Sequence, residues 1–185
     1  MTNFNENEGV KIDVVHAYLI LGLVLCHKPT KILELGLGGG RSCEAILSAM
    51  DFNKNSAQLT VVDNWCDWGG AMPAGVMEMY GNRASIKTSD EKEFVHSTGD
   101  KFDFIMSDAD HNHTNEWFDY VYENLLLPGG IIIYHDINLF EDSFVNLRQI
   151  YARCLAKNYR HHLFNQNSLP GERCHRGLLV IFKDL

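Results

Sequence analysis

The sequence predicts one α/β domain, built on a doubly wound sheet that is mostly parallel and carries an antiparallel strand at its carboxyl end. Short apolar runs rich in β-branched residues alternate with segments whose apolar residues recur at helical spacing, which is typical of βαβ units. The length of 185 residues suits a single domain over 1–185, and no repeat or linker divides it. Two final apolar runs are separated by a loop too short for a crossover helix, which indicates antiparallel pairing.

The expected elements follow in chain order from the apolar pattern. Residues 1–29 are expected to form an N-terminal helical segment, because the apolar stretch from Val14 to Cys26 is too short to span a bilayer and ends before Pro29. Apolar residues recur at helical spacing in 43–50, 118–125 and 144–155. The expected strands are 31–36, 58–63, 84–89, 102–108 and 131–136, followed by the antiparallel pair 160–164 and 177–182.

Composition and charge restrict the class of protein. The chain is 45% hydrophobic and 22% charged, which is typical of a soluble globular protein. A formal net charge of -8 without clustered Lys and Arg argues against a nucleic-acid partner. The polar start lacks the basic region of a signal peptide, and no membrane partner is expected. Five cysteines without metal-finger spacing indicate reduced thiols and a cytoplasmic location.

The segment ILELGLGGG, residues 32–40, joins an acid to a loop of glycines. Glycine has no Cβ and tolerates positive φ, so the backbone here can closely approach a bound molecule. A dinucleotide fingerprint needs a third glycine where Arg41 stands. Glu34 would repel a phosphate, yet it could accept hydrogen bonds from an ammonium group. The loop is therefore predicted to hold a cofactor without phosphates.

Polar residues follow the strands of the expected sheet, at the edge where open α/β sheets bind ligands. Packing alone does not explain such a group at one edge of an apolar sheet. The alternative for Ser89, Asp90 and Asp110 is that they cap the helices that follow. The residues at the strand ends are Glu34, Asp63, Ser89, Asp90, Asp108, Asp110, His135 and Asp136.

Four motifs in this order resemble the class I S-adenosylmethionine-dependent methyltransferases, which have a Rossmann-like fold. They are ELGLGGG, an acid at the end of the second strand, DFIMSDADH at the fourth strand and LLLPGGIIIYHD at the fifth. The resemblance implies S-adenosyl-L-methionine as cofactor, with the glycine loop around its amino-acid end, Asp63 on its ribose hydroxyls and Ser89 or Asp90 beside its adenine. The implied cofactor-binding residues are Glu34, Gly36, Gly38, Gly40, Asp63, Ser89, Asp90 and Asp108.

SDADHNH and YHDI are similar to motifs of the cation-dependent O-methyltransferases. The similarity implies a divalent cation, Mg²⁺ or Mn²⁺, held by Asp108, His135 and Asp136. The His-Asp pair departs from the Asp-Asn of the catechol-type enzymes and is closer to sugar- and antibiotic-modifying relatives. An imidazole ligand shifts the preference from magnesium towards manganese, iron or zinc. The alternative is an acid after the fourth strand with no ion, as in many related enzymes.

His111 occupies the position of the lysine base of the catechol-type enzymes. A hydroxyl must lose its proton as it attacks the methyl carbon, and a neutral imidazole can accept that proton. His111, or alternatively His135, is therefore the expected catalytic base. The competing interpretation is a solvated histidine in a polar loop.

Residues 64–83 are the expected substrate lid, centred on 65–73, because they mix Trp65, Trp68 and three methionines with glycines. The alternative is a core helix with an irregular start.

The favoured function is O-methylation of a small-molecule acceptor such as a sugar or phenolic. The resemblance also implies a homodimer, because relatives often form dimers. A nicotinamide-dependent oxidoreductase and a non-catalytic S-adenosylmethionine-binding accessory protein are the alternatives. Arg41 and Glu34 argue against the first alternative, and the group Asp108, His111, His135 and Asp136 argues against the second.

Overall fold

Seven strands form one mixed sheet in the computed structural model, which describes residues 12–54, 56–137, 145–164 and 176–185. The strands are β1 (Lys31–Leu35), β2 (Gln58–Asp63), β3 (Ala84–Thr88), β4 (Phe102–Ser107), β5 (Leu126–His135), β6 (Arg160–Phe164) and β7 (Leu178–Phe182). They lie in the order β3-β2-β1-β4-β5-β7-β6. β1 to β5 are parallel, and β7 is antiparallel to both β5 and β6. The predicted fold class is confirmed.

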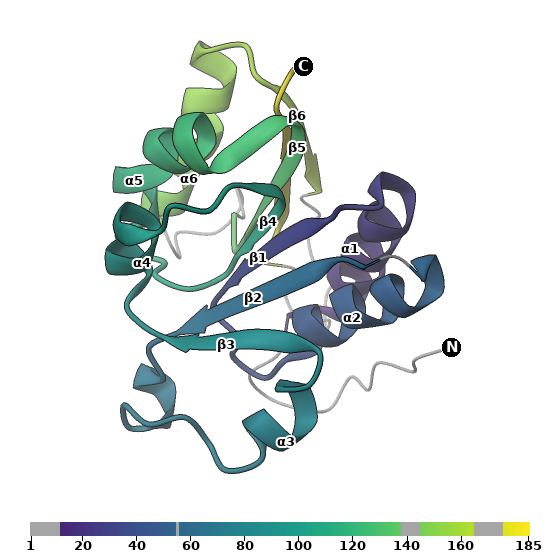
Figure 1. Ribbon diagram of the computed structural model, residues 1–185. Coiled ribbons are helices and arrows are strands. Elements are labelled where there is room, and N and C mark those ends of the chain that lie inside the picture. Colours follow the sequence, from purple (N-terminus) through teal and green to yellow (C-terminus); the bar gives the residue numbers. More distant parts are fainter. Residues whose placement is uncertain (1–11, 55, 138–144, 165–175) are drawn as a thin grey trace, which may run out of the picture.

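Helices cover both faces of this sheet. They are α1 (Val14–His27), α2 (Arg41–Asn53), α3 (Val76–Tyr80), α4 (Glu91–Ser97), α5 (Thr114–Tyr120) and α6 (Val145–Ala156), with a 3-10 turn at Cys66–Trp68 and a π-helical turn at Val121–Leu125. α1 and α2 lie on one face, and α4, α5 and α6 lie on the other (Figure 1). Among the described residues, no helix combines the length and the apolar character needed to cross a membrane.

The core consists of two apolar clusters, one on each face of the sheet. Successive residues of a strand serve opposite faces, so Ile32 packs in the cluster of α1 and α2, whereas Leu33 packs in the cluster of α4, α5 and α6. Phe104 and Ile105 alternate in the same way on β4. Because both faces are covered, the central strands are continuous apolar runs in the sequence.

The strand order reverses between β1 and β4. The chain moves outward from β1 through β2 to β3, and it then returns to the other side of β1 as β4. Leu35, the last residue of β1, is level with Val62 of β2 and with Ser107 of β4. The carboxyl ends of these strands therefore meet at one edge, which is the position where doubly wound sheets bind ligands.

Two elements differ from the sequence prediction. α4 was not expected, because a helix of 7 residues is too short to show a clear apolar period. β5 begins at Leu126 rather than at 131, and its pairing with β4 is irregular between Phe102 and Phe104, beside the Pro128–Gly130 stretch. Of the helix expected over 144–155, Phe144 lies outside the described residues, as do residues 1–11 of the N-terminal segment.

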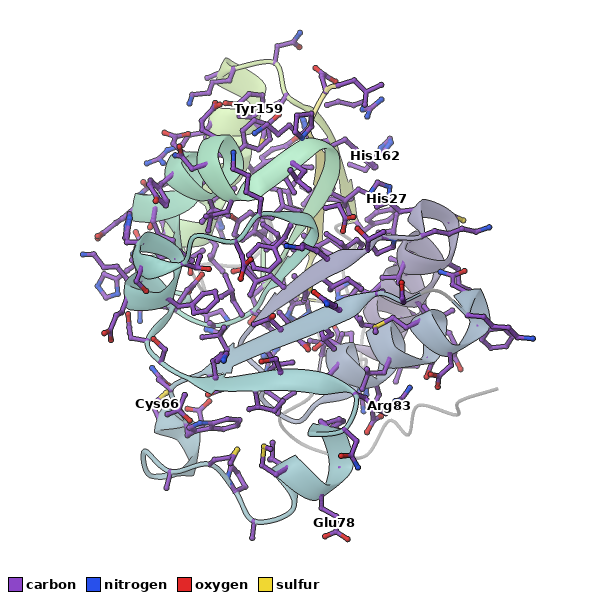
Figure 2. All side chains as sticks on the ribbon, viewed as in Figure 1. His27, Cys66, Glu78, Arg83, Tyr159 and His162 are labelled. Carbon is purple, nitrogen blue, oxygen red and sulfur yellow. The ribbon has the colours of Figure 1, made fainter. Side chains whose placement is uncertain are left out.

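The segment 64–83 lies beyond β3, at the end of the sheet that carries α3 (Figure 2). Trp65 is completely buried and its Nε1 donates to Thr88 Oγ1 at 2.9 Å, so this residue belongs to the core rather than to a lid. Met72, Met77 and Met79 are exposed, which excludes a core helix over the whole segment. A lid formed by the residues after Trp65 stays a prediction.

Candidate active site

A cavity of about 370 Å³ lies outside the carboxyl ends of β1, β2 and β4. It therefore occupies the position where the strand order reverses. The predicted site residues in its wall are Gly36, Gly38, Asp63, Ser89, Asp90, Asp108 and His111. Four predicted site residues lie outside that wall, namely Glu34, Gly40, His135 and Asp136.

Each glycine of the loop has its own structural reason. Gly36 has a φ of +86°, and a Cβ on it would lie 2.4 Å from the carbonyl oxygen of Asp108, so no larger residue fits between β1 and β4. Gly40 precedes α2 with a φ of +78°, and a Cβ there would lie 2.4 Å from the hydroxyl of Tyr80. Gly40 thus packs against α3, and its contact with the cofactor stays a prediction.

Glu34 lies beneath the glycine loop and is completely buried. Its Oε1 accepts a hydrogen bond from Ser42 Oγ at 2.5 Å, which joins β1 to the first turn of α2. Burial raises the pKa of Glu34 from 4.5 to about 8, against the opposing effect of the Ser42 hydrogen bond. Glu34 lies outside the cavity wall, and its contact with a cofactor stays a prediction.

Asp63 ends β2 in the cavity wall and also holds the glycine loop in place. Its Oδ2 accepts from the backbone N–H of Leu37 at 2.8 Å, and its Oδ1 accepts from the N–H of Trp65 at 2.6 Å. A carboxylate oxygen has more than one acceptor site. Asp63 can therefore serve the loop and still accept hydrogen bonds from a ligand.

The capping interpretation holds for Asp90 among the three residues to which it was applied. Asp90 precedes α4, and its Oδ1 accepts from Glu93 N at 3.3 Å, yet Asp90 also lines the cavity. Asp110 accepts from the N–H groups of Asn112 and His113 at 2.9 and 3.2 Å and so stabilises the turn after β4. Capping and ligand contact are therefore compatible at the strand ends.

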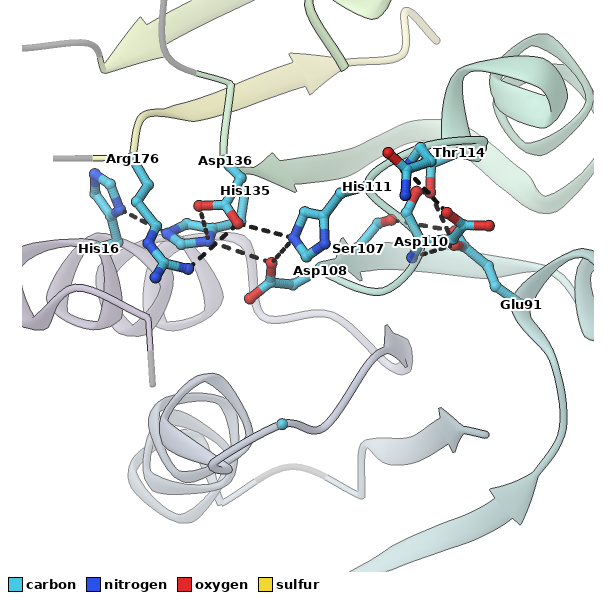
Figure 3. A network of polar contacts seen from close by, with 12 residues as sticks. His16, Glu91, Ser107, Asp108, Asp110, His111, Thr114, His135, Asp136 and Arg176 are labelled. Carbon is cyan, nitrogen blue, oxygen red and sulfur yellow. Dashed lines mark hydrogen bonds and ion pairs between the residues drawn. The ribbon is translucent and has the colours of Figure 1, made fainter. Parts of the chain in front are cut away.

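Two histidines and two aspartates form one network at the ends of β4 and β5 (Figure 3). His111 Nε2 lies 3.3 Å from Asp108 Oδ1 and 2.8 Å from Asp136 Oδ2. His135 Nδ1 lies 3.2 Å from both Asp108 Oδ1 and Asp136 Oδ1. Arg176, which precedes β7, places Nη1 3.6 Å from Asp136 Oδ2. The structure thus brings together all four residues predicted for catalysis and metal binding.

The network favours the ionised forms of His111, His135 and Asp108. Burial lowers the pKa of His111, but hydrogen bonding with Asp108 and then with Asp136 outweighs burial and raises it to about 10. Burial likewise opposes a charge on His135, whose pKa is nevertheless raised, chiefly by the charge of Asp108. Burial raises the pKa of Asp108, but the charge of His135 holds it well below its ordinary range.

A family model described as a methyltransferase domain matches residues 33–137, which extend from β1 to the end of β5. The chain belongs to this methyltransferase family. The matched residues include the glycine loop, the cavity and the His-Asp pair, so the family prediction made from the sequence motifs is confirmed. A search among curated proteins finds no match to the chain.

Solved structures of methyltransferases share the fold. An O-methyltransferase from Bacillus cereus, in complex with S-adenosylhomocysteine (SAH), has a TM-score of 0.72 at 17% identity, covering 95% of this chain and 84% of that one. TomG from Streptomyces achromogenes, an O-methyltransferase of tomaymycin synthesis in complex with S-adenosylmethionine (SAM), has a TM-score of 0.73 at 14% identity, covering 95% and 82%. A SAM-dependent O-methyltransferase from Thermotoga maritima has a TM-score of 0.69 at 13% identity, covering 96% and 68%.

Glu91 is a residue of this methyltransferase site that the sequence analysis missed. It is the first residue of α4, lines the cavity and is buried, which raises its pKa. Its Oε1 accepts from Ser107 Oγ at 3.3 Å, while Oε2 accepts from Asp110 N at 3.1 Å and from Thr114 Oγ1 at 2.8 Å (Figure 3). Glu91 therefore fixes the turn that carries Asp108 and His111. Only its place directly after a strand-end acid, Asp90, could have indicated it.

His135 is the last residue of β5 and lies outside the cavity wall. It is 1% exposed and lies beside Asp108. Its Nε2 faces Nδ1 of His16, a buried residue of α1, at 3.1 Å. His135 as the base stays a prediction, and the structure gives its Nδ1 a contact with Asp108 at 3.2 Å. His16 was also missed, because it is 119 positions away from His135 in the sequence.

Proposed function

We propose that this chain is a SAM-dependent O-methyltransferase that acts on a small hydroxylated metabolite. The observation that carries the proposal is the chemistry of the cavity at the switch point. Its wall joins two glycines of the loop to six acidic residues, and within the described part of the chain it includes neither lysine nor arginine. The six acids are Asp63, Asp67, Asp90, Glu91, Asp108 and Asp110.

This wall suits the cation SAM better than a nicotinamide dinucleotide. A pyrophosphate needs backbone N–H groups or basic side chains, whereas a sulfonium and an ammonium group are stabilised by nearby carboxylates. We assign Asp63, at the end of β2, to the ribose hydroxyls and Ser89 and Asp90, after β3, to the adenine, which is supported by their place in the cavity wall. The solved relatives in complex with SAM and SAH share this fold, which supports the same assignment.

His111 is the proposed base of the transfer. The acceptor oxygen forms a bond to the methyl carbon while the carbon–sulfur bond breaks, its electron pair passes to sulfur to give SAH, and the hydroxyl proton passes to His111. His111 lines the cavity, and its Nε2 faces Asp108 and Asp136, so its neutral form keeps the proton on Nε2 and the lone pair on Nδ1. These two carboxylates then stabilise the imidazolium that forms.

A divalent cation is compatible with the residues behind His111. Asp108, His135 and Asp136 each offer one ligand atom, and these atoms lie within 4.8 Å of one another. One imidazole with two carboxylates suits Mn²⁺ better than Mg²⁺. When bound, such an ion makes a hydroxyl more acidic and so assists proton transfer to His111.

The acceptor, assembly and location follow as parts of the same proposal. An acidic cavity without basic side chains in the described wall disfavours nucleic acid and anionic acceptors. The described cysteines, Cys26, Cys43, Cys66 and Cys154, are free thiols, which supports a cytoplasmic location. A homodimer is proposed from the resemblance alone.

Calorimetric titration of the purified chain with SAH, with NAD as the comparison ligand, tests the cofactor. We expect saturable binding of SAH, none of NAD, and a loss of about tenfold in SAH affinity for Asp63→Asn, the effect of one charge-assisted hydrogen bond. Asp100→Asn, an exposed substitution remote from the cavity, is the matched control. An assay of methyl transfer to hydroxylated acceptors then distinguishes an enzyme from an accessory protein. A folded chain that binds NAD instead of SAH would overturn the proposal.

A further inference from the structure

A second group of metal-ligand side chains lies outside the cavity wall, where the start of α1 meets the end of β5. Asp13, His16 and His135 each offer one ligand atom, and these atoms lie within 4.8 Å of one another. His16 and His135 are 3% and 1% exposed, and Asp13, which precedes α1, is partly exposed. His16 and His135 lie side by side at the end of the polar network opposite Glu91 (Figure 3).

The separations in this group match those of ligands around one ion. His16 Nδ1 lies 3.1 Å from His135 Nε2 and 3.6 Å from Asp13 Oδ2. Nitrogen and oxygen ligands at zinc distances from a tetrahedral ion lie roughly 3.3 Å apart. The two rings are inclined at 79°, so they meet through their nitrogens rather than face to face. Small shifts of the side chains would place all three ligand atoms around a common centre.

Groups that orient the ligands are already in place. Metal-binding histidines usually donate the N–H of their other ring nitrogen to a carboxylate, which fixes the ring and increases its basicity. His135 Nδ1 has such a partner in Asp108 Oδ1 at 3.2 Å. Asp13 Oδ2 accepts from the backbone N–H of Arg176 at 3.2 Å, which orients its carboxylate.

We propose that Asp13, His16 and His135 form a binding site for a transition-metal ion of the Zn²⁺ type, with His135 binding through Nε2. Two imidazoles and one carboxylate select such ions over Mg²⁺ and Ca²⁺. The site differs from the group Asp108, His135 and Asp136, which would use Nδ1 of the same ring. The proton on His135 Nδ1 then remains directed at Asp108, which lines the cavity. An ion on Nε2 therefore connects α1 to Asp108 through the ring of His135.

The competing explanation is a hydrogen-bonded pair of histidines without an ion. One ring nitrogen of a neutral histidine donates and the other accepts, so a 3.1 Å contact between His16 and His135 also satisfies both residues. The two explanations differ in metal affinity and in its dependence on Asp13. They can be separated without measuring methyl transfer.

The test is metal binding by the full chain after removal of metals with a chelator. Co²⁺ is titrated at pH 8 and followed by its visible absorption, and Zn²⁺, Mn²⁺ and Mg²⁺ are titrated calorimetrically. We expect one equivalent of Zn²⁺ or Co²⁺ with the intense absorption of a tetrahedral site, and much weaker Mg²⁺ binding. His16→Asn and Asp13→Asn should each weaken Zn²⁺ binding by at least about 100-fold, since even partners outside the ligand set contribute about 10- to 100-fold.

Two controls place the ion. Asp136→Asn should weaken Zn²⁺ binding less than His16→Asn or Asp13→Asn, by about tenfold, because Asp136 contacts His135 Nδ1 at 3.2 Å without being a ligand of this site. His27→Gln removes the histidine at the other end of α1 and should have no effect. Loss of binding in Asp136→Asn with retention in His16→Asn would move the ion to the group Asp108, His135 and Asp136. No Zn²⁺ or Co²⁺ binding by the folded chain would also overturn the proposal, and if His16→Asn fails to fold, Asp13→Asn decides.

Discussion

Glu34→Gln should remove a pH dependence from the stability of this fold. The wild-type carboxyl is completely buried between β1 and α2, and burial raises its pKa from 4.5 to about 8. A carboxyl whose pKa is raised by folding contributes stability that is fully present below its pKa in the unfolded chain. This stability is lost as the pH rises through its pKa in the folded protein. Glutamine keeps an oxygen that accepts from Ser42 and cannot ionise.

The size of the effect follows from the two pKa values. The difference between 4.5 and about 8 corresponds to about 5 kcal/mol of unfolding free energy, an upper limit that is reached above pH 8. The free energy of unfolding of Glu34→Gln relative to wild type should therefore rise between pH 5 and pH 9. Most of this rise should fall between pH 5 and pH 8.

Urea unfolding at several pH values between 5 and 9 measures this difference, provided that both proteins unfold in two states. Glu78→Gln on α3 is the matched control, because this glutamate is exposed. A difference between Glu34→Gln and wild type that stays constant within about 0.5 kcal/mol over this range, the size of an ordinary surface effect, would refute the reasoning.

Three further predictions concern the site. Gly36→Ala should abolish SAH binding in calorimetry, because its Cβ would meet the Asp108 carbonyl at 2.4 Å. Gly40→Ala should mainly lower the free energy of unfolding, by about 1 to 3 kcal/mol. The wild-type kcat/KM should rise from pH 7 towards pH 10, because His111 with a pKa of about 10 must lose its proton to act as a base. His111→Gln should lower kcat at least about 100-fold and flatten that profile, and full activity would exclude His111 as the base. Glu91→Gln should raise the KM for SAM more than it lowers kcat, since it loosens the turn after β4, and an unchanged KM would contradict this role.

The sequence predicted the sheet and the edge that carries the site because both depend on local signals. Four of the five parallel strands are short apolar runs, and β3 is the exception. The polar residues after the strands follow a rule of topology rather than of packing. Asp63 and Asp108 could therefore be placed in the cavity without a structure. His111 was assigned from the resemblance to the catechol-type enzymes, and it lies beside Asp108 because it follows β4 in the same turn.

What the sequence could not predict depends on contacts between distant elements. Glu34 and Gly40 belong to the right motif, but Glu34 contacts α2 through Ser42 and Gly40 contacts α3 through Tyr80, and neither lies in the cavity wall. His16 reads as one polar residue in an apolar helix until α1 is packed beside the end of β5. Glu91 similarly becomes recognisable only when α4 meets the turn after β4.

Asp136 shows how side-chain chemistry overrides backbone preference at this site. Its φ of 62° is in the left-handed region, where a residue other than glycine is strained by about 1 kcal/mol or more. Glycine would remove the strain, and aspartate only reduces it. The carboxylate, however, lies 2.8 Å from His111 Nε2 and 3.6 Å from Arg176 Nη1, and it is almost completely buried. The backbone after β5 therefore stays in its strained form because these two cationic groups hold the side chain. Aspartate is required at this position by the polar network and not by the turn.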